Sequence, residues 1–377
     1  TTTNRFMRTN NTENPLFLGL VGLTQFVPLI LLGLISGYVS DKYNRKLIFF
    51  WCMLIESIIA CSFIILNSFE TTKVIYLFYP LIALGIVRAF FGPASSALLP
   101  NIVNKKTLPD AVALSAISWQ TGSVFGPIAG GVIYGISENL GYVFASSCLL
   151  FGALLILSIP KTANQAKVKS MTLKNLVMGF SYVWNKKILL GVISLDLFAV
   201  IFAGAIALLP IYARDILETG PTTLGLLRAA PGIGAILVAI LLSRYSIKNN
   251  SGLVMLFAVA FFGFFTMLFG ISTNTTLSII FLCFIGGFDM LSVYIREIIV
   301  QLGTEDKMRG RVNSINMMFV GASNELGEFR AGMMAFWMGS VPAVFLGGLG
   351  AIAITGVWSI LFPELRKLNK LKGNFSS

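Results

Sequence analysis

Eleven apolar stretches, each long enough to cross a lipid bilayer, dominate this chain of 377 residues. About 20 apolar residues in a helix span a hydrocarbon core about 30 Å thick. This criterion predicts spans at residues 16–39, 47–67, 74–98, 110–134, 140–160, 188–210, 222–244, 252–272, 276–301, 309–337 and 341–362. Only 12% of the residues are charged, far below the share in soluble domains. The sequence therefore predicts an all-α polytopic membrane protein that has the lipid bilayer as its solvent.

Positive charge gathers in alternate loops. Most of the 28 lysines and arginines follow the odd-numbered spans, whereas the opposite loops and the N-terminal tail contain only Arg5, Arg8, Lys73 and Arg214. Because cytoplasmic loops are enriched in Lys and Arg, the Lys-rich side and the C-terminus are predicted to be cytoplasmic. The net charge of +12 is thus explained by membrane topology, and nucleic acid is not an expected partner.

The chain has no histidine, and its four cysteines fall inside apolar spans without paired spacing. These features predict neither a metal site nor a disulfide framework. We expect no cofactor and no enzymatic activity, because no serine–base pair is apparent either. Any proton carrier in this chain must be a carboxylate.

The predicted spans fall into two groups separated by the longest hydrophilic stretch. Residues 1–160 form an N-terminal bundle of five spans, 161–187 a cytoplasmic linker, and 188–377 a C-terminal bundle of six spans. Eleven spans and a cytoplasmic C-terminus place Thr1 outside, which suggests that a first helix is absent from this sequence. Two six-span repeats are the layout in which secondary transporters hold their substrate at mid-membrane.

A charged loop after the first counted span contains Gly37, Asp41, Lys42, Arg45 and Lys46. Positive-inside anchoring explains the cations but does not require an aspartate four residues after a glycine. The loop resembles that between the second and third helices of the major facilitator superfamily, which has the pattern Gly-x-x-x-Asp-Arg/Lys-x-Gly-Arg-Arg/Lys. Asn44 replaces the second glycine. The resemblance implies a conformational latch, in which Asp41 and Arg45 bridge helix ends.

Arg88 lies near the middle of its span, where an unpaired arginine is costly. A structural ion pair is one interpretation. The segment also resembles the fourth-helix motif of the superfamily, which Leu84, Arg88 and Gly92 match, although Phe91 replaces a frequent glutamine. The resemblance implies that Arg88 takes part in proton coupling or holds the cargo.

A glycine-rich segment within the span 110–134 contains Gly122, Gly126, Pro127, Gly130 and Gly131. Close helix packing is the simple interpretation. The pattern is also similar to the fifth-helix signature of antiporters in the superfamily, which favours export over import.

Two further segments, Phe90–Pro100 and Met308–Val312, resemble the bacterial exporter branch that contains macrolide efflux proteins and the enterobactin exporter. The likeness covers the chain from about residue 15. It implies two pseudo-symmetric six-helix bundles in the bacterial inner membrane, working as a monomer that exports an amphipathic small molecule in exchange for protons. The cargo is either a drug such as a macrolide or a siderophore. An importer of the same fold and a non-transporting scaffold are the alternatives.

Glu325 and Glu328 are three residues apart and share one helical face within a predicted span. Carboxyl groups in an apolar interior can carry protons unless a cation pairs with them. We therefore expect proton or substrate contacts from Glu325, Glu328 and the neighbouring Asn324. Arg330 is also a candidate for the substrate cavity, and a buried bridge between Arg330 and one of the two glutamates is the competing interpretation.

Other charged residues within spans leave alternatives open. Glu56 and Asp196 are lone carboxylates, suited either to proton handling or to a polar helix contact. Arg228 either extends toward lipid headgroups or attracts anionic cargo. Asp289 shares a face with Arg296 and is a candidate for the substrate cavity, whereas loop anchoring is favoured for Arg296 and Glu297.

Overall fold

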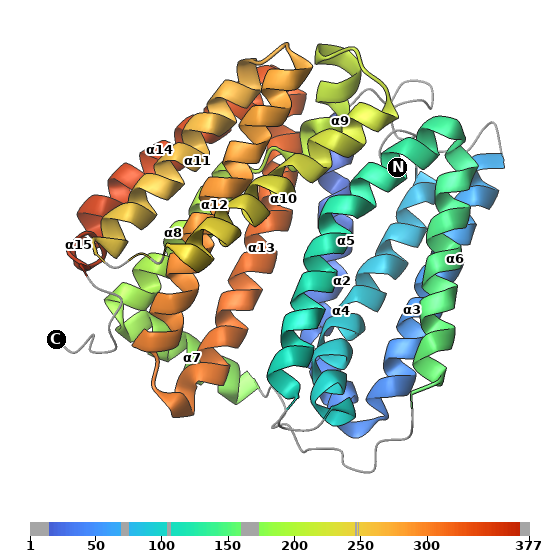
Figure 1. The fold of residues 1–377 in the computed structure, drawn as a ribbon, viewed down its shortest axis with the longest axis horizontal. Coiled ribbons are helices and arrows are strands. Elements are labelled where there is room, and N and C mark those ends of the chain that lie inside the picture. Colours follow the sequence, from blue (N-terminus) through green and yellow to red (C-terminus); the bar gives the residue numbers. More distant parts are fainter. Residues whose placement is uncertain are drawn as a thin grey trace. The chain divides into compact units, whose positions relative to one another are not determined.

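The computed structural model describes residues 15–68, 75–103, 107–159, 173–245, 247 and 249–369. Every regular element in these ranges is a helix. The part of the predicted linker at 161–172 lies outside the described residues. The chain divides into two compact units, shown in Figure 1 as two sets of long helices. Unit 1 takes the described residues from Val21 to Thr172, and unit 2 those from Leu173 onward together with Pro15–Leu20.

Unit 1 is built around α3, which packs along both α4 and α6. A pair of serines joins α3 to α6: the Ser57 hydroxyl donates to the Ser146 carbonyl at 2.9 Å, and the Ser146 hydroxyl donates to the Ser57 carbonyl at 3.1 Å. Such small polar residues allow close contact between helices in lipid. The helices are α2 (Pro15–Lys42), α3 (Arg45–Ser68), α4 (Ile75–Ile102), α5 (Leu108–Ile136) and α6 (Glu138–Leu157).

Unit 2 contains the more extensive core. α12 packs along α10 and α11, α11 packs along α14, and α8 lies against α13 and α14. The helix starts follow from local sequence: Pro221 opens α10, and the Asn274 side chain caps α12 by accepting a hydrogen bond from the Leu277 amide. The helices are α7 (Leu173–Asn185), α8 (Lys187–Ala203), η1 (Ile206–Leu208), α9 (Leu209–Ile211), η2 (Tyr212–Ile216), α10 (Pro221–Arg244), α11 (Ser251–Ile271), α12 (Thr275–Gly303), α13 (Asp306–Met338), α14 (Ser340–Leu361) and α15 (Pro363–Arg366).

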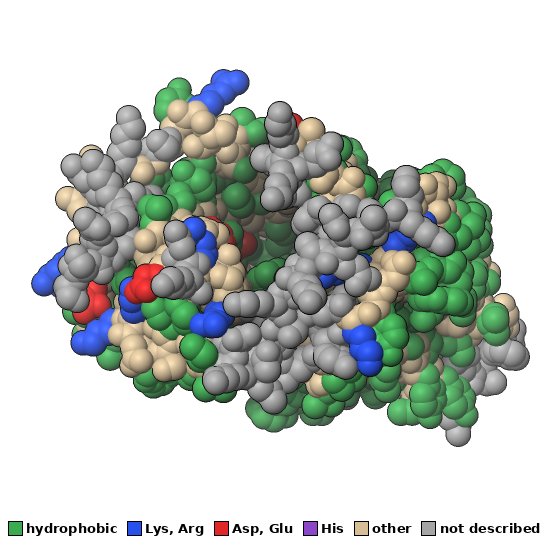
Figure 2. All heavy atoms as spheres, turned by 90° about the horizontal axis from the view of Figure 1, so that it is seen from below, with side chains coloured by type: hydrophobic (Ala, Val, Ile, Leu, Met, Phe, Trp, Pro, Cys, Tyr) green, Lys and Arg blue, Asp and Glu red, His purple; other side chains and the backbone are tan. Residues whose placement is uncertain are grey.

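Nine helical segments in the described part of the chain are long and apolar enough to cross a membrane. α5 and α13, which contain two of the eleven predicted spans, are 29 and 33 residues long but are not among the nine. Large apolar side chains such as Trp51, Phe257 and Ile360 are exposed. Figure 2 shows such side chains on the outer sides, with Lys and Arg scattered over the end toward the viewer. An apolar exterior of this kind is typical of a protein surrounded by lipid.

One predicted span is broken. The sequence predicted a single span over 188–210, but α8 ends at Ala203, and the short helices η1, α9 and η2 follow. Gly204 leaves helical geometry with φ −60° and ψ 87°. Pro210, in the first turn of α9, has no amide hydrogen to donate to an earlier turn. The buried Tyr212 hydroxyl anchors the segment by donating to the Gly270 carbonyl at 2.8 Å.

Candidate functional site

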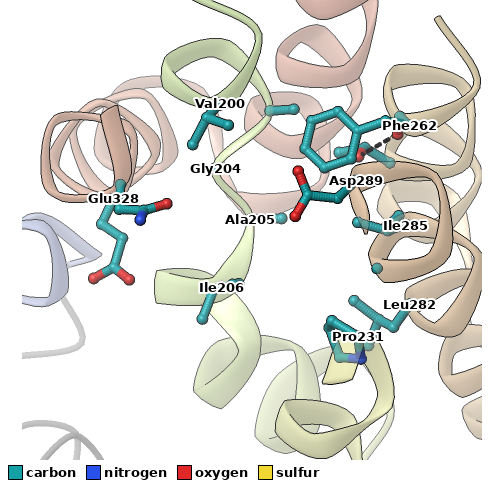
Figure 3. Close-up of a pocket in the computed structure, with 14 residues that line it drawn as sticks. Val200, Gly204, Ala205, Ile206, Pro231, Phe262, Leu282, Ile285, Asp289 and Glu328 are labelled. Atoms are coloured by element: carbon teal, nitrogen blue, oxygen red, sulfur yellow. Dashed lines mark hydrogen bonds between the residues drawn. The ribbon is translucent and has the colours of Figure 1, made fainter. Parts of the chain in front are cut away.

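A cavity of about 120 Å³ lies inside unit 2, beside this break (Figure 3). Its walls come from the broken segment and from four surrounding helices, α10, α11, α12 and α13. Most lining side chains are apolar, including Phe262 and Leu282. The polar side chains in the lining are Thr266, Asp289, Asn324 and Glu328. A mostly apolar cavity with a few polar groups is the usual form of a small-molecule site.

The broken backbone at Gly204 and Ala205 forms part of the cavity wall. Non-helical backbone at membrane depth is tolerated where it lines a cavity. Glycine is needed here for packing as well: a Cβ on Gly204 would lie 2.8 Å from the carbonyl carbon of Gly327, and a Cβ on Gly327 would lie 2.8 Å from the Val200 oxygen. These two glycines bring α13 close against the end of α8.

Asp289 of α12 and Glu328 of α13 both line this cavity. Figure 3 shows their carboxylates on opposite sides of the Gly204–Ala205 segment. Asn324, one turn before Glu328, also lines the cavity, whereas Glu325 does not. Three of the predicted site residues are therefore brought together, although they come from two helices.

The two predicted arginines of unit 2 have different surroundings. Arg228 of α10 interacts electrostatically with Glu328. Arg330 of α13 instead lies against α14, where a Cβ on Gly347 would be 2.9 Å from its Nη2, and its Nη1 donates to the Met334 sulfur at 2.8 Å. Arg228 is thus the arginine associated with a cavity carboxylate.

Asp196 forms a buried salt bridge with Arg296, which links α8 to α12. The side chains are 7% and 4% exposed. On the next residue of α12, Glu297 accepts a hydrogen bond of 2.8 Å from the Asn316 amide of α13. Arg296 is therefore an interior residue, and the loop-anchoring interpretation of this arginine is wrong. The sequence did not reveal the pair, because its members are separated by five intervening helical elements.

In unit 1, Glu56 of α3 and Arg88 of α4 interact electrostatically across adjacent helices. Glu56 is half-buried and Arg88 is exposed. Both arginine and carboxylate thus remain reachable from the surface of unit 1, in contrast to the enclosed pair in unit 2.

The charged loop joins α2 to α3. Gly37 and Asp41 belong to the last turns of α2, and their side chains lie outside the described part of the structure. Lys42 is exposed and Arg45 is buried. Lys46 donates to the carbonyl oxygens of Leu157, at 2.9 Å, and Ile159, at 2.5 Å, so it caps the C-terminal end of α6.

The glycine-rich segment lies in α5, with Pro127 inside the helix. A Cβ added at Gly122, Gly126 or Gly130 would meet no described atom within 4 Å. Close helix packing at these glycines is therefore not seen among the described residues. Gly131 directly follows Gly130 in α5 and is half-exposed.

The fold has clear relatives among solved structures. A bacterial homologue of the human lysosomal transporter Spinster superposes with a TM-score of 0.73 at 13% identity, covering 94% of this chain and 91% of its own. The nucleoside transporter NupG superposes with a TM-score of 0.69 at 14% identity, covering 96% and 94%. These likenesses show that the chain has a fold found in solved multi-pass membrane transporters.

Residues 3–374 match the family MFS_3, described as transmembrane secretion effector, and the chain belongs to this family. Its curated relatives include the enterobactin exporter EntS of Citrobacter koseri, 25% identical over 362 residues. EntS of Escherichia coli O1:K1 is 24% identical over 360 residues. Each alignment covers 93% of this chain and 83% of the relative. The resemblance inferred from the sequence motifs is confirmed.

Proposed function

We propose that this protein is a proton-coupled antiporter that exports an amphipathic small molecule across the bacterial inner membrane by alternating access. Membership of a family of secretion effectors and relatives named as exporters favour export over import. In this proposal the Lys-rich loops and the C-terminus face the cytoplasm. The working unit is a monomer surrounded by lipid.

One observation carries the coupling proposal: two carboxylates, Asp289 and Glu328, line a single apolar cavity. A charged carboxylate in such a site is costly, and protonation removes that cost. Proton binding and cargo binding then favour different conformations, which is the requirement for coupling the two. Arg228, close to Glu328, would stabilise its ionised form or attract an anionic group of the cargo.

The relatives favour a siderophore over a macrolide as cargo, because they are named for enterobactin. The Asp289–Glu328 cavity alone is small for either molecule, so it would hold one polar group of the cargo together with the exchangeable proton. A mixture of apolar wall and carboxylate, amide and hydroxyl groups suits an amphipathic ligand.

Residues of unit 1 have supporting roles in this proposal. Asp41 and Arg45 form a latch at the α2–α3 junction, and Arg88 with Glu56 forms a second charged pair available to protons. The open glycines of α5 allow another helix to approach during the transport cycle.

The proposal is tested in liposomes that contain the purified protein, with a pH gradient, using enterobactin and a macrolide as separate probes. Replacing Asp289 by Asn or Glu328 by Gln should reduce pH-driven export by about tenfold, a loss of about 1.4 kcal/mol in transition-state stabilisation. Glu305→Gln is the matched control, because this carboxylate is exposed at the start of α13. Glu325 does not line the cavity, so Glu325→Gln should reduce pH-driven export less than Glu328→Gln does.

Export of enterobactin by the unaltered protein that ignores the pH gradient would reject proton coupling. Export of the macrolide alone would reject the siderophore assignment. Full coupling in both Asp289→Asn and Glu328→Gln would show that the proton is carried elsewhere, with Glu56 the next residue to replace.

A further inference from the structure

A second group of buried polar side chains lies in unit 2, between Asp289 and the turn that joins α12 to α13. It consists of Asp196, Ser292, Arg296 and Asn316, which are buried, and Glu297, which is half-buried. Asp196 comes from α8 and Asn316 from α13, and the other three come from α12. None of these five side chains lines the cavity. The proposed coupling through Asp289 and Glu328 makes no use of them.

These groups continue from the cavity in a connected series. Asp289, Ser292 and Arg296 share one face of α12, because their spacings are three and four residues. With a rise of 1.5 Å per residue, Arg296 lies about 10 Å along the helix from Asp289. Asp196 interacts electrostatically with both Asp289 and Glu297. Glu297 in turn is bonded to Asn316.

Three atoms of this group have no hydrogen-bond partner among the described residues: Ser292 Oγ, Arg296 Nε and Asn316 Oδ1. Their residues are only 3%, 3% and 4% exposed. Buried polar groups nearly always have a partner. The set mixes a donor, an acceptor and a hydroxyl that can do either, and water satisfies all three kinds.

A bound metal ion fits these residues less well. Among the described residues, no group of three or more His, Cys, Asp or Glu side chains is arranged to hold one. Arg296 Nε also needs an acceptor, which a cation cannot provide.

The charges nearby favour a positively charged guest. Asp196, Asp289 and Glu297 are three carboxylates, and Arg296 is the cation paired with them. Of the other helices packed on α12, α11 has no charged residue, and α10 contains Arg228, whose electrostatic partner is Glu328, and Arg244 in its last turn. The first turns of α13 contain Asp306, Lys307, Arg309 and Arg311. Around Asp289 and Glu297 the three carboxylates outnumber the one arginine, Arg296, which favours hydronium over hydroxide or another anion there.

We propose that Asp196, Ser292, Arg296, Glu297 and Asn316 form a hydrated proton path that connects Asp289 to the α12–α13 end of unit 2. The path rests on the proposed function, because it supplies or removes the proton that the cavity carboxylates exchange. A proton that leaves Asp289 binds to a water oxygen, and that water passes another proton onward toward Glu297. Each transfer breaks one O–H bond and forms another. Arg296 keeps its proton and stays paired with Asp196 beside the path.

The test uses the double variant Ser292→Ala with Asn316→Leu in liposomes that contain a trapped pH indicator, with enterobactin as probe. Ser278→Ala is the matched control, since Ser278 is a fully buried serine near the opposite end of the same helix. We expect pH-driven export and the accompanying proton flux to fall about tenfold in the double variant. Exchange of labelled for unlabelled enterobactin at equal pH should stay near the control rate, because this exchange needs no net proton release.

The two proposals fail in different ways. An unaltered protein that transports enterobactin without pH dependence overturns proton coupling, and the path with it. The path alone is overturned if export by the unaltered protein depends on the pH gradient and the double variant has the same proton flux as Ser278→Ala. A structure at a resolution that shows water gives a test without cargo. Ordered water bonded to Ser292 Oγ and Asn316 Oδ1 supports the path. The absence of water beside these two atoms in such a structure overturns it.

Discussion

The two units treat charge inside a membrane protein differently. In unit 2, Asp196 and Arg296 are almost completely enclosed and joined by a salt bridge. In unit 1, the corresponding interaction joins a half-buried Glu56 to an exposed Arg88. An enclosed charge must keep its partner at all times, whereas an exposed one can exchange its partner for water or a ligand. This difference in burial indicates that Asp196–Arg296 is a structural pair, whereas Glu56 and Arg88 can change partners.

The glycines between α10 and α12 of unit 2 differ in their surroundings from those of the α5 signature in unit 1. In unit 2, a Cβ on Gly286 would overlap the Pro231 carbonyl, and a Cβ on Gly234 would overlap the Cys283 carbonyl, so α10 and α12 are in backbone contact. In unit 1, Gly122, Gly126 and Gly130 of α5 face no described atom within 4 Å. Gly234 and Gly286 are therefore needed for the observed packing of α10 on α12, and Gly122, Gly126 and Gly130 of α5 are not needed for the packing described.

The largest effect is expected when the enclosed pair is broken. Replacing Arg296 by Met leaves Asp196 charged and buried without its partner, which should cost about 3–5 kcal/mol of unfolding free energy. Thermal unfolding in detergent measures the loss. Arg88→Met in unit 1 should cost less than about 1 kcal/mol, because Arg88 is exposed and its partner Glu56 is only half-buried.

The double variant Asp196→Leu with Arg296→Met is the control for this comparison. Removing both charges should recover most of the lost stability, because no uncompensated charge remains. Equal losses for Arg296→Met and Arg88→Met would remove the distinction drawn between the two units.

The positions of the long helices followed from apolar length alone. The spans predicted at 252–272 and 276–301 coincide closely with α11 and α12, since lipid demands continuous apolar helices. The break at Gly204 was missed, although the glycine and Pro210 were visible signals. The Asp196–Arg296 pair could not be predicted, because hydropathy contains no information on which helices are neighbours. For the same reason, the sequence could not show that Asp289 of α12 and Glu328 of α13 line one cavity.

The second effect concerns the glycine contact between α10 and α12. Gly286→Ala should lower the unfolding free energy by about 1–3 kcal/mol, because the added methyl group must displace backbone. Gly287→Ala is the adjacent control: its Cβ would meet the Val238 side chain at 3.1 Å, and a side chain can move. A lower melting temperature in detergent for Gly287→Ala than for Gly286→Ala would contradict the backbone contact assigned between Gly286 and Pro231.

A smaller effect is expected at the α2–α3 junction of unit 1. Lys46→Met removes the donor to the carbonyls of Leu157 and Ile159, with an expected loss of about 1 kcal/mol in a partly solvated position. Hydrogen exchange of the last turn of α6 should rise in this variant. Lys42→Met, at an exposed position of the same loop, should leave that exchange unchanged.

The smallest change in stability is expected at the open glycines of α5. Gly122→Ala should leave the unfolding free energy unchanged or raise it by up to about 1 kcal/mol, because alanine favours a helix and the added methyl group has space. If another helix approaches this face during transport, export should nevertheless fall. Gly33→Ala is the matched control, an equally open glycine on α2 outside the signature. Reduced export in Gly122→Ala alone, with both melting temperatures preserved, would assign the α5 glycines to a conformation other than the one described. Unaltered export in both variants would leave these glycines without a role in movement, and the contrast between the units would then be one of packing only.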